Sequence, residues 1–160
     1  MKRILFFAAF VMFGMASFAQ SNADEVALLQ SVYGMEKKQI VADHMKITDP
    51  EKTAFWQAYD EYELARKAIG TKRANGIAEY AKNYTTMTDD KANELVNKSL
   101  ALNTEFLKLQ KSTYKKMSKA ITPLRAAQFF QLEMFLENMV RLELASEIPF
   151  IGEFDVKKAK

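Results

Sequence analysis

The stretch that decides the fold is ITPLRAAQFFQLEMFLENMVRLELASEIP, residues 121–149. Thr122 can accept hydrogen bonds from the free backbone N–H groups of a first helical turn, and Pro123 fits the first position of a helix. Because Pro149 cannot continue a helix, we predict this one over residues 123–148. Its apolar residues cover more than one face, so the helix must be packed on two sides or must bind something.

The same start signal occurs upstream, where residues 47–51 read ITDPE. Thr48 or Asp49 can cap the helix, Pro50 fits its first turn, and Glu51 would complete a capping box with Thr48. The sequence therefore predicts a second helix from Pro50 to about residue 84.

Two more helices complete the pattern, over residues 22–46 and 89–120. The latter has leucines seven residues apart, which approximates a short coiled-coil seam. Gly70 and Gly76 lie inside the second predicted helix, so we expect a kink or a short break between them. Scarce Gly and Pro (5 and 3 in 160 residues) also favour helices. We predict an all-α fold of about four helices that form a long, curved hairpin or a bundle.

The N-terminus has the layout of a secretory signal peptide. Lys2 and Arg3 precede an uncharged run over residues 4–15, and small residues lead to Ala19, after which we expect cleavage. The run is too short for a comfortable membrane span, although an uncleaved anchor is the alternative. We predict three parts: a signal peptide (1–19), a helical domain (20–148) and a C-terminal tail (149–160). The protein would be periplasmic or secreted and would touch the membrane only transiently.

The charge and the cysteine content exclude several classes of function and of binding site. Removal of Lys2 and Arg3 lowers the formal net charge from +3 to +1, so the mature chain does not favour nucleic acid as its partner. The chain has no cysteine, which excludes disulfides, thiolate catalysis and cysteine-based metal sites.

No catalytic constellation is evident in the sequence. His44 is the only histidine, and we expect it to be half-exposed at a helix end. Glutamates four residues apart occur at 133/137 and 143/147, but the Glu-x-x-His motif of bundle metal sites is absent. We expect Glu133 and Glu137 to face water and to pair with Lys or Arg on a neighbouring helix. The sequence predicts a protein that is not an enzyme and needs no cofactor.

Lysines line one face of the helix predicted over residues 89–120. They are Lys98, Lys108, Lys111, Lys115, Lys116 and Lys119. One interpretation is a solvated face. The other is a basic, partly apolar surface that attracts acidic unfolded polypeptide or an anionic membrane.

The two helix starts, ITDPE and ITPLR, resemble the LTxxQ-type motif of the periplasmic Spy/CpxP family, with Glu51 and Arg125 where that family has Gln. The layout of an exported, cysteine-free, four-helix chain is similar to that family over most of the mature sequence. The end segment also resembles uncharacterised exported helical proteins of the Bacteroidetes type. The resemblance implies an ATP-independent chaperone or envelope-stress modulator, built as a curved helical hairpin and often paired as a dimer.

We therefore expect a binding protein that holds unfolded or envelope polypeptides on an amphiphilic helical surface. One alternative is a structural protein that docks a fixed partner through its last helix and tail, and another is a metal-responsive sensor. The expected binding surface comprises Lys108, Lys111, Lys115, Phe129, Phe130, Phe135, Met139 and Phe150, and the expected helix-cap residues are Thr48, Pro50, Thr122 and Pro123.

Overall fold

The computed structural model describes residues 21–152 and is entirely helical over that range. Its elements are α1 (Ser21–Met45), α2 (Asp49–Asn83), a single 3₁₀ turn η2 (Tyr84–Thr86), α3 (Asp89–Ala120) and α4 (Pro123–Glu147). The predicted all-α fold of four helices is confirmed. The predicted signal peptide and the end of the predicted tail, residues 153–160, lie outside the described residues.

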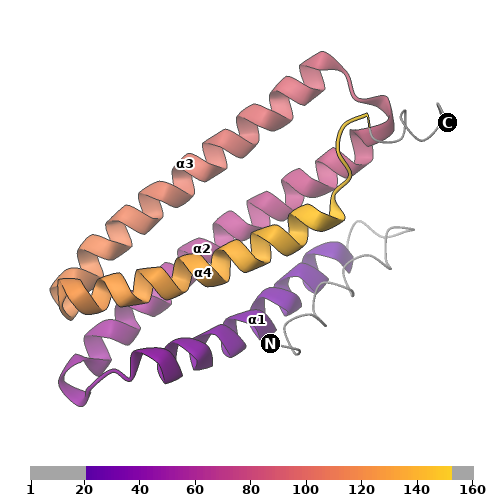
Figure 1. The fold of residues 1–160 in the computed structure, drawn as a ribbon. Coiled ribbons are helices and arrows are strands. Elements are labelled where there is room, and N and C mark those ends of the chain that lie inside the picture. Colours follow the sequence, from indigo (N-terminus) through magenta and orange to yellow (C-terminus); the bar gives the residue numbers. More distant parts are fainter. Residues whose placement is uncertain (1–20, 153–160) are drawn as a thin grey trace.

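The four helices form an up-down-up-down bundle (Figure 1). Connections of a few residues force successive helices to run antiparallel. Each helix packs against its neighbours in the order α1, α2, α3, α4 and back to α1, so α2 and α4 face each other diagonally across the interior. Helices α3 and α4 meet at the left of Figure 1 and separate toward the right.

Aromatic side chains fill the interior near the α1–α2 and α3–α4 connections. Phe55, Tyr59 and Tyr62 recur at helical spacing on α2 and are buried against Phe129 of α4. The Phe129 ring meets all three edge-on, with the centroid of Phe55 at 5.8 Å and an interplanar angle of 84°. Such pairs contribute about 0.5–1.5 kcal/mol each beyond the area they bury, so this cluster anchors α4 diagonally to α2.

The starts of α2 and α4 differ in their capping hydrogen bonds. The Thr122 hydroxyl accepts a hydrogen bond from the Arg125 backbone N–H at 3.3 Å, and Pro123 is in the first turn, as predicted. Thr48 also precedes its helix, but its side chain accepts no capping bond. Its hydroxyl instead donates to the Glu51 carboxylate at 2.8 Å, and the Glu51 backbone N–H donates to the Thr48 carbonyl at 3.0 Å, so the expected bond from the Glu51 N–H to the Thr48 hydroxyl is absent.

The two helix starts lie at the same end of the bundle and touch. The Arg125 guanidinium donates to the Met45 carbonyl at 2.8 Å, which satisfies a free carbonyl at the C-terminus of α1. It also forms an ion pair with Glu51 at 3.4 Å. Glu51 and Arg125, each in the first turn of its helix, therefore hold the two helix starts together.

The predicted break between Gly70 and Gly76 is wrong, because α2 is a continuous helix from 49 to 83. Each internal glycine costs about 1 kcal/mol relative to alanine, but tertiary packing along the helix outweighs that preference. Ile69 is buried beside the first glycine, and Lys72 binds Glu105 of α3 at 2.7 Å.

Candidate binding surface

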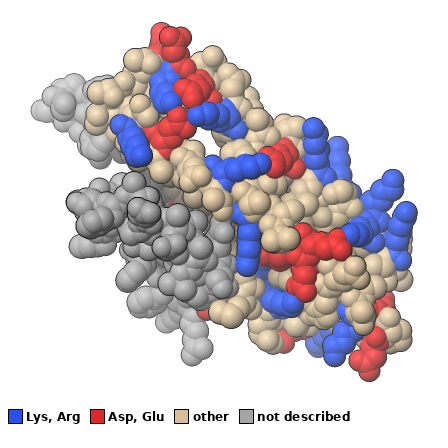
Figure 2. Space-filling model, turned by 180° about the vertical axis from the view of Figure 1, so that it is seen from behind, with Lys and Arg blue, Asp and Glu red and all other residues tan. Residues whose placement is uncertain are grey.

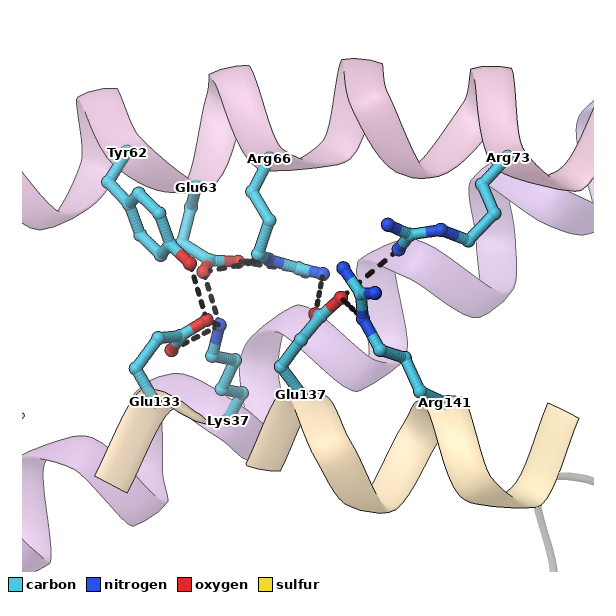
Figure 3. Close-up of polar contacts among 8 residues, drawn as sticks. All are labelled: Lys37, Tyr62, Glu63, Arg66, Arg73, Glu133, Glu137 and Arg141. Atoms are coloured by element: carbon cyan, nitrogen blue, oxygen red, sulfur yellow. Dashed lines mark hydrogen bonds and ion pairs between the residues drawn. The ribbon is translucent and has the colours of Figure 1, made fainter. Parts of the chain in front are cut away.

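A network of charged side chains occupies the interior between α1, α2 and α4 (Figure 3). Lys37 of α1 is 1% exposed and donates to Glu63 of α2 at 2.6 Å and to Glu133 of α4 at 2.7 Å. Tyr62 donates its hydroxyl to Glu133 at 2.6 Å. One lysine therefore links three helices, and Arg66 closes this half of the network by binding Glu63 at 3.0 Å.

The second half of the network surrounds Glu137. Arg73 of α2 donates to its carboxylate at 3.1 Å, and Arg141, one turn further along α4, donates at 2.9 Å. Arg66 approaches the same carboxylate at 4.0 Å, so it joins the two halves. Glu133, Glu137 and Arg141 lie four residues apart, which places all three on the inner face of α4.

The expectation that Glu133 and Glu137 face water is wrong, although they do pair with Lys and Arg on neighbouring helices. Glu133 is 0% and Glu137 is 7% exposed. Sequence spacing could not show this, because a polar stripe at helical spacing fits either a solvated face or an interior network. The signal that could have found it was the surplus of apolar residues on the other side of the same helix.

Burial and the surrounding charges shift the pKa values of Glu63 and Tyr62. Burial alone would raise the pKa of Glu63, but Lys37 and Arg66 outweigh it and hold that pKa below its usual range. Burial, together with the nearby Glu133 carboxylate, raises the pKa of the Tyr62 hydroxyl well above its ordinary value. The Glu63 carboxylate is thus held ionised by its two cations, and Tyr62 is held as a neutral donor.

The inward charges leave α4 with an outer face that carries none. Its exposed residues, among the α4 side chains that the structure describes, are Pro123, Leu124, Ala127, Gln128, Gln131, Met134, Phe135, Asn138, Met139, Leu142, Ala145 and Ser146. Leu124, Phe135 and Leu142 are 72%, 61% and 73% exposed. An ordinary surface helix has the opposite arrangement, with its apolar face inside and its charges outside.

Helix α3 carries a second stripe of exposed apolar side chains. Val96, Leu100, Leu107 and Tyr114 are exposed at spacings of four and seven residues, which aligns them along one side of α3. Tyr114 contacts Phe130 of α4 edge-on, with ring centroids 5.5 Å apart, so the stripe meets α4 at Tyr114. We call Val96, Leu100, Leu107, Tyr114, Leu124, Phe130, Met134, Phe135, Met139 and Leu142 the α3/α4 surface.

The structure brings part of the predicted binding surface together. Phe135 and Met139 are exposed on the outer face of α4, whereas Phe130 is half-buried beside Tyr114. Phe129 is completely buried in the aromatic cluster and belongs to the core, so including it in a binding surface is wrong. Phe150 is 82% exposed, beyond the end of α4.

Lys108, Lys111 and Lys115 are exposed on α3 and form no ion pair within the described part of the chain. Lys111 lies one turn from both Leu107 and Tyr114, so this lysine borders the α3/α4 surface. Figure 2, from the opposite side, shows basic side chains gathered toward the end of the molecule where α3 meets α4. Lys115 also borders an open groove of about 430 Å³ between α2 and α3.

Other candidate groups are separate from this surface. His44 is exposed near the end of α1 rather than half-exposed. Among residues 21–152, no group of three or more His, Cys, Asp or Glu side chains could hold a metal ion, and no helix is long and apolar enough to span a membrane. No family model, curated protein or solved structure matches this chain.

Proposed function

We propose that the chain is a non-enzymatic binding protein of the cell envelope, similar in type to Spy and CpxP, that holds unfolded or partner polypeptides on the α3/α4 surface. The observation that carries the proposal is the arrangement of α4, which has charged side chains on its inner face and apolar side chains on its outer face. Its Glu133, Glu137 and Arg141 side chains form ion pairs on the inner side of the helix, and its exposed residues are uncharged and largely apolar. Monomeric proteins rarely leave contiguous apolar surface exposed unless it binds something.

The composition of the surface suits weak, adaptable binding. Met134 and Met139 are flexible and polarisable, so they can pack against client side chains of many shapes. Lys108, Lys111 and Lys115 on α3 form no ion pair in the described part of the chain, so they would attract acidic segments of a client over several ångströms. The surface therefore combines long-range attraction with contact that needs no fixed ligand shape.

The interior network does not favour an enzyme. Its carboxylates already bind lysine or arginine, and its residues are buried rather than arranged around a cleft. A general acid or base must reach a substrate within hydrogen-bond distance. We therefore assign the network to holding α1, α2 and α4 together.

The test is suppression of aggregation of a chemically reduced client by the purified protein, with Leu142→Lys as the surface variant. We expect the wild type to suppress aggregation at several-fold excess and the variant to be several-fold weaker. Leu64→Lys, at a 75% exposed leucine on α2, is the matched control and should match the wild type. No suppression by the wild type at several-fold excess would exclude this function.

A second candidate is docking of one fixed partner through the segment after α4. Tyr80 donates its hydroxyl to the Pro149 carbonyl at 2.7 Å, and Tyr84 donates to the Phe150 carbonyl at 2.8 Å. These bonds fix the backbone at Phe150 while its side chain remains exposed. A single stoichiometric partner in envelope extracts, lost in Phe150→Ala but retained in Leu142→Lys, would favour this candidate.

A further inference from the structure

The interior network has more cations than carboxylates. Its cations are Lys37, Arg66, Arg73 and Arg141, and its carboxylates are Glu63, Glu133 and Glu137. Because an arginine cannot release its proton in a protein, the surplus positive charge remains at neutral pH. Charges inside folded proteins are normally paired, so the surplus cation indicates that an anion from outside the network can bind there.

The surplus lies at the Glu137 end of the network. Arg66 already binds both oxygens of Glu63, through its Nε at 3.0 Å and its Nη2 at 3.1 Å. Arg73 and Arg141 instead share one oxygen of Glu137, which each contacts through a single nitrogen, at 3.1 and 2.9 Å. Among the described residues, Glu137 is the only carboxylate that pairs with either of these two arginines. Two cations therefore meet one anion.

The guanidinium of Arg73 has a buried hydrogen-bond donor without a partner. Its Nη2 is buried and forms no hydrogen bond in the described structure, and Figure 3 shows Arg73 joined to the network by a single contact. Burial, and then the neighbouring Arg141 cation, lower the pKa of Arg73, so its surroundings disfavour the charge that it carries. A second anion beside Arg73 would satisfy this donor and offset the repulsion from Arg141.

The surroundings of these two arginines suit a carboxylate that arrives from solvent. The side chains of Arg73 and Arg141 are 23% and 34% exposed, whereas that of Arg66 is 11% exposed. The ring of Phe106 on α3 lies beside both guanidiniums, with its centroid 5.9 and 5.2 Å from their central carbons. Asn103 accepts a hydrogen bond from Arg141 at 3.4 Å, and its amide NH₂ can donate to an anion. A carboxylate matches the planar guanidinium fork and has the single negative charge that the network lacks.

From the surplus charge and the unpartnered donor, we propose that Arg73, Arg141 and Asn103 form a binding site for a carboxylate group, which we call the arginine site. The source of the carboxylate is an acidic side chain of a polypeptide on the α3/α4 surface, and this part rests on the proposed function. Asn103 lies one turn from both Leu100 and Leu107, so exposed apolar side chains of that surface border the arginine site. The ligand that fits is a segment with an acidic residue among apolar ones.

Stability in two sodium salts tests the arginine site without any client. A ligand that binds only the native protein raises the urea midpoint, by about 0.2 M when its concentration equals its dissociation constant. We expect the midpoint of the full-length wild type at neutral pH to be higher by at least this amount in sodium acetate than in sodium chloride of equal ionic strength. Arg73→Gln removes the surplus cation and should abolish this acetate effect. The variant should still fold, because Arg141 continues to bind Glu137 at 2.9 Å.

Lys72→Gln is the matched control, because Lys72 precedes Arg73 and pairs with Glu105 at 2.7 Å in an exposed position. It should retain the full acetate effect. Asn103→Leu, at an exposed position, keeps every charge and should weaken acetate binding severalfold. The proposal is overturned if the wild type shows no acetate effect. It is also overturned if the effect persists unchanged in Arg73→Gln, or if Lys72→Gln loses it to the same extent.

Two labelled peptides then identify the source of the carboxylate. Both are short, unstructured and rich in leucine, and they differ only in a central glutamate or glutamine. By fluorescence anisotropy, the wild type should bind the glutamate peptide about tenfold more tightly, as expected for one charge-assisted hydrogen bond, and Arg73→Gln should bind both equally. Equal binding of both peptides by the wild type would overturn the polypeptide as the source and assign the site to a free small carboxylate. Binding of neither peptide would contradict the proposed function, whereas the acetate effect does not depend on a client.

Discussion

Replacing Lys37 by Met tests whether the interior network holds the bundle together. Methionine has a similar length and no charge, so the substitution removes the cation with little change in packing. It leaves Glu63 and Glu133, which both bind the Lys37 ammonium in the wild type, at 2.6 and 2.7 Å. Arg66 still neutralises Glu63, and Tyr62 still donates to Glu133.

The magnitude follows from the charges left behind. Because both carboxylates bind the same Lys37 nitrogen, at 2.6 and 2.7 Å, their nearest oxygens are at most about 5 Å apart, and they repel each other by about 3 kcal/mol at an effective dielectric constant of about 20. Glu133 also loses its cation while it is completely buried, and breaking a buried pair in this way costs about 3–5 kcal/mol. We expect the free energy of unfolding to fall by about 3–5 kcal/mol, which is a large part of the 5–15 kcal/mol of a typical domain.

The assay is urea unfolding at 25 °C, followed by helical circular dichroism and by the fluorescence of Trp56, the only tryptophan. With a slope of roughly 2 kcal/mol per molar urea, the midpoint should fall by about 2 M. Lys38→Met is the matched control, because Lys38 is the next residue and pairs with Asp60 at 2.6 Å in an exposed position. It should change stability by no more than about 1 kcal/mol.

The pH dependence of stability gives a second check, because the wild type and Lys37→Met should respond to falling pH in opposite directions. In the wild type the pKa of Glu63 is lowered on folding, so its contribution is present above the ordinary carboxyl pKa and is lost as pH falls through the lower, folded value. In Lys37→Met, a proton taken up by the two facing carboxylates relieves their repulsion, so stability should rise as pH falls from about 8 to about 5. A decrease of less than about 1 kcal/mol in the free energy of unfolding of Lys37→Met would refute this reasoning. A variant that loses stability as pH falls, as the wild type does, would also refute it.

Three further predictions concern single groups, each measured by urea unfolding. Thr122→Ala removes a capping hydrogen bond and should lower the free energy of unfolding by about 1 kcal/mol, whereas Thr48→Ala should lower it by clearly less. Equal losses would contradict the observed difference in capping between the two helix starts. Tyr62→Phe should lose about 1.5–3 kcal/mol with its bond to a carboxylate, but Tyr59→Phe, whose buried hydroxyl has no partner in the described structure, should be neutral or stabilising. Gly76→Ala should stabilise by about 0.5–1 kcal/mol, because an added Cβ meets nothing within 4 Å inside a continuous helix, and destabilisation would indicate a break there.

Local signals in the sequence were sufficient for the helices. Thr122 with Pro123 marks a helix start through groups that interact within one turn, and the predicted helix bounds agree with the structure within a few residues. The resemblance to Spy and CpxP stays a prediction. The bundle also follows from short connections, which leave successive helices no choice but to run antiparallel.

The interior contacts could not be predicted in the same way, because the pairing of side chains from different helices has no signal in the neighbouring sequence. Lys37 and Glu133 are 96 positions apart, and nothing near either residue indicates that they meet. Phe129 and Phe135 look alike in the sequence, yet one is buried and the other exposed, because the charged stripe of α4 turns inward. Periodicity indicated that apolar residues cover more than one face of α4, but only tertiary packing decided which face is exposed to solvent.

The central claim is that the outer face of α4 is the contact surface, and photo-cross-linking tests it most directly. A photoreactive amino acid replaces Leu142 in one sample and Leu64 in the other, and each protein is illuminated with a reduced, unfolded client. Both leucines are about equally exposed, at 73% and 75%, so only their position differs. We predict client adducts from position 142 at several times the yield from position 64, whereas equal yields, or adducts from position 64 alone, would contradict the account.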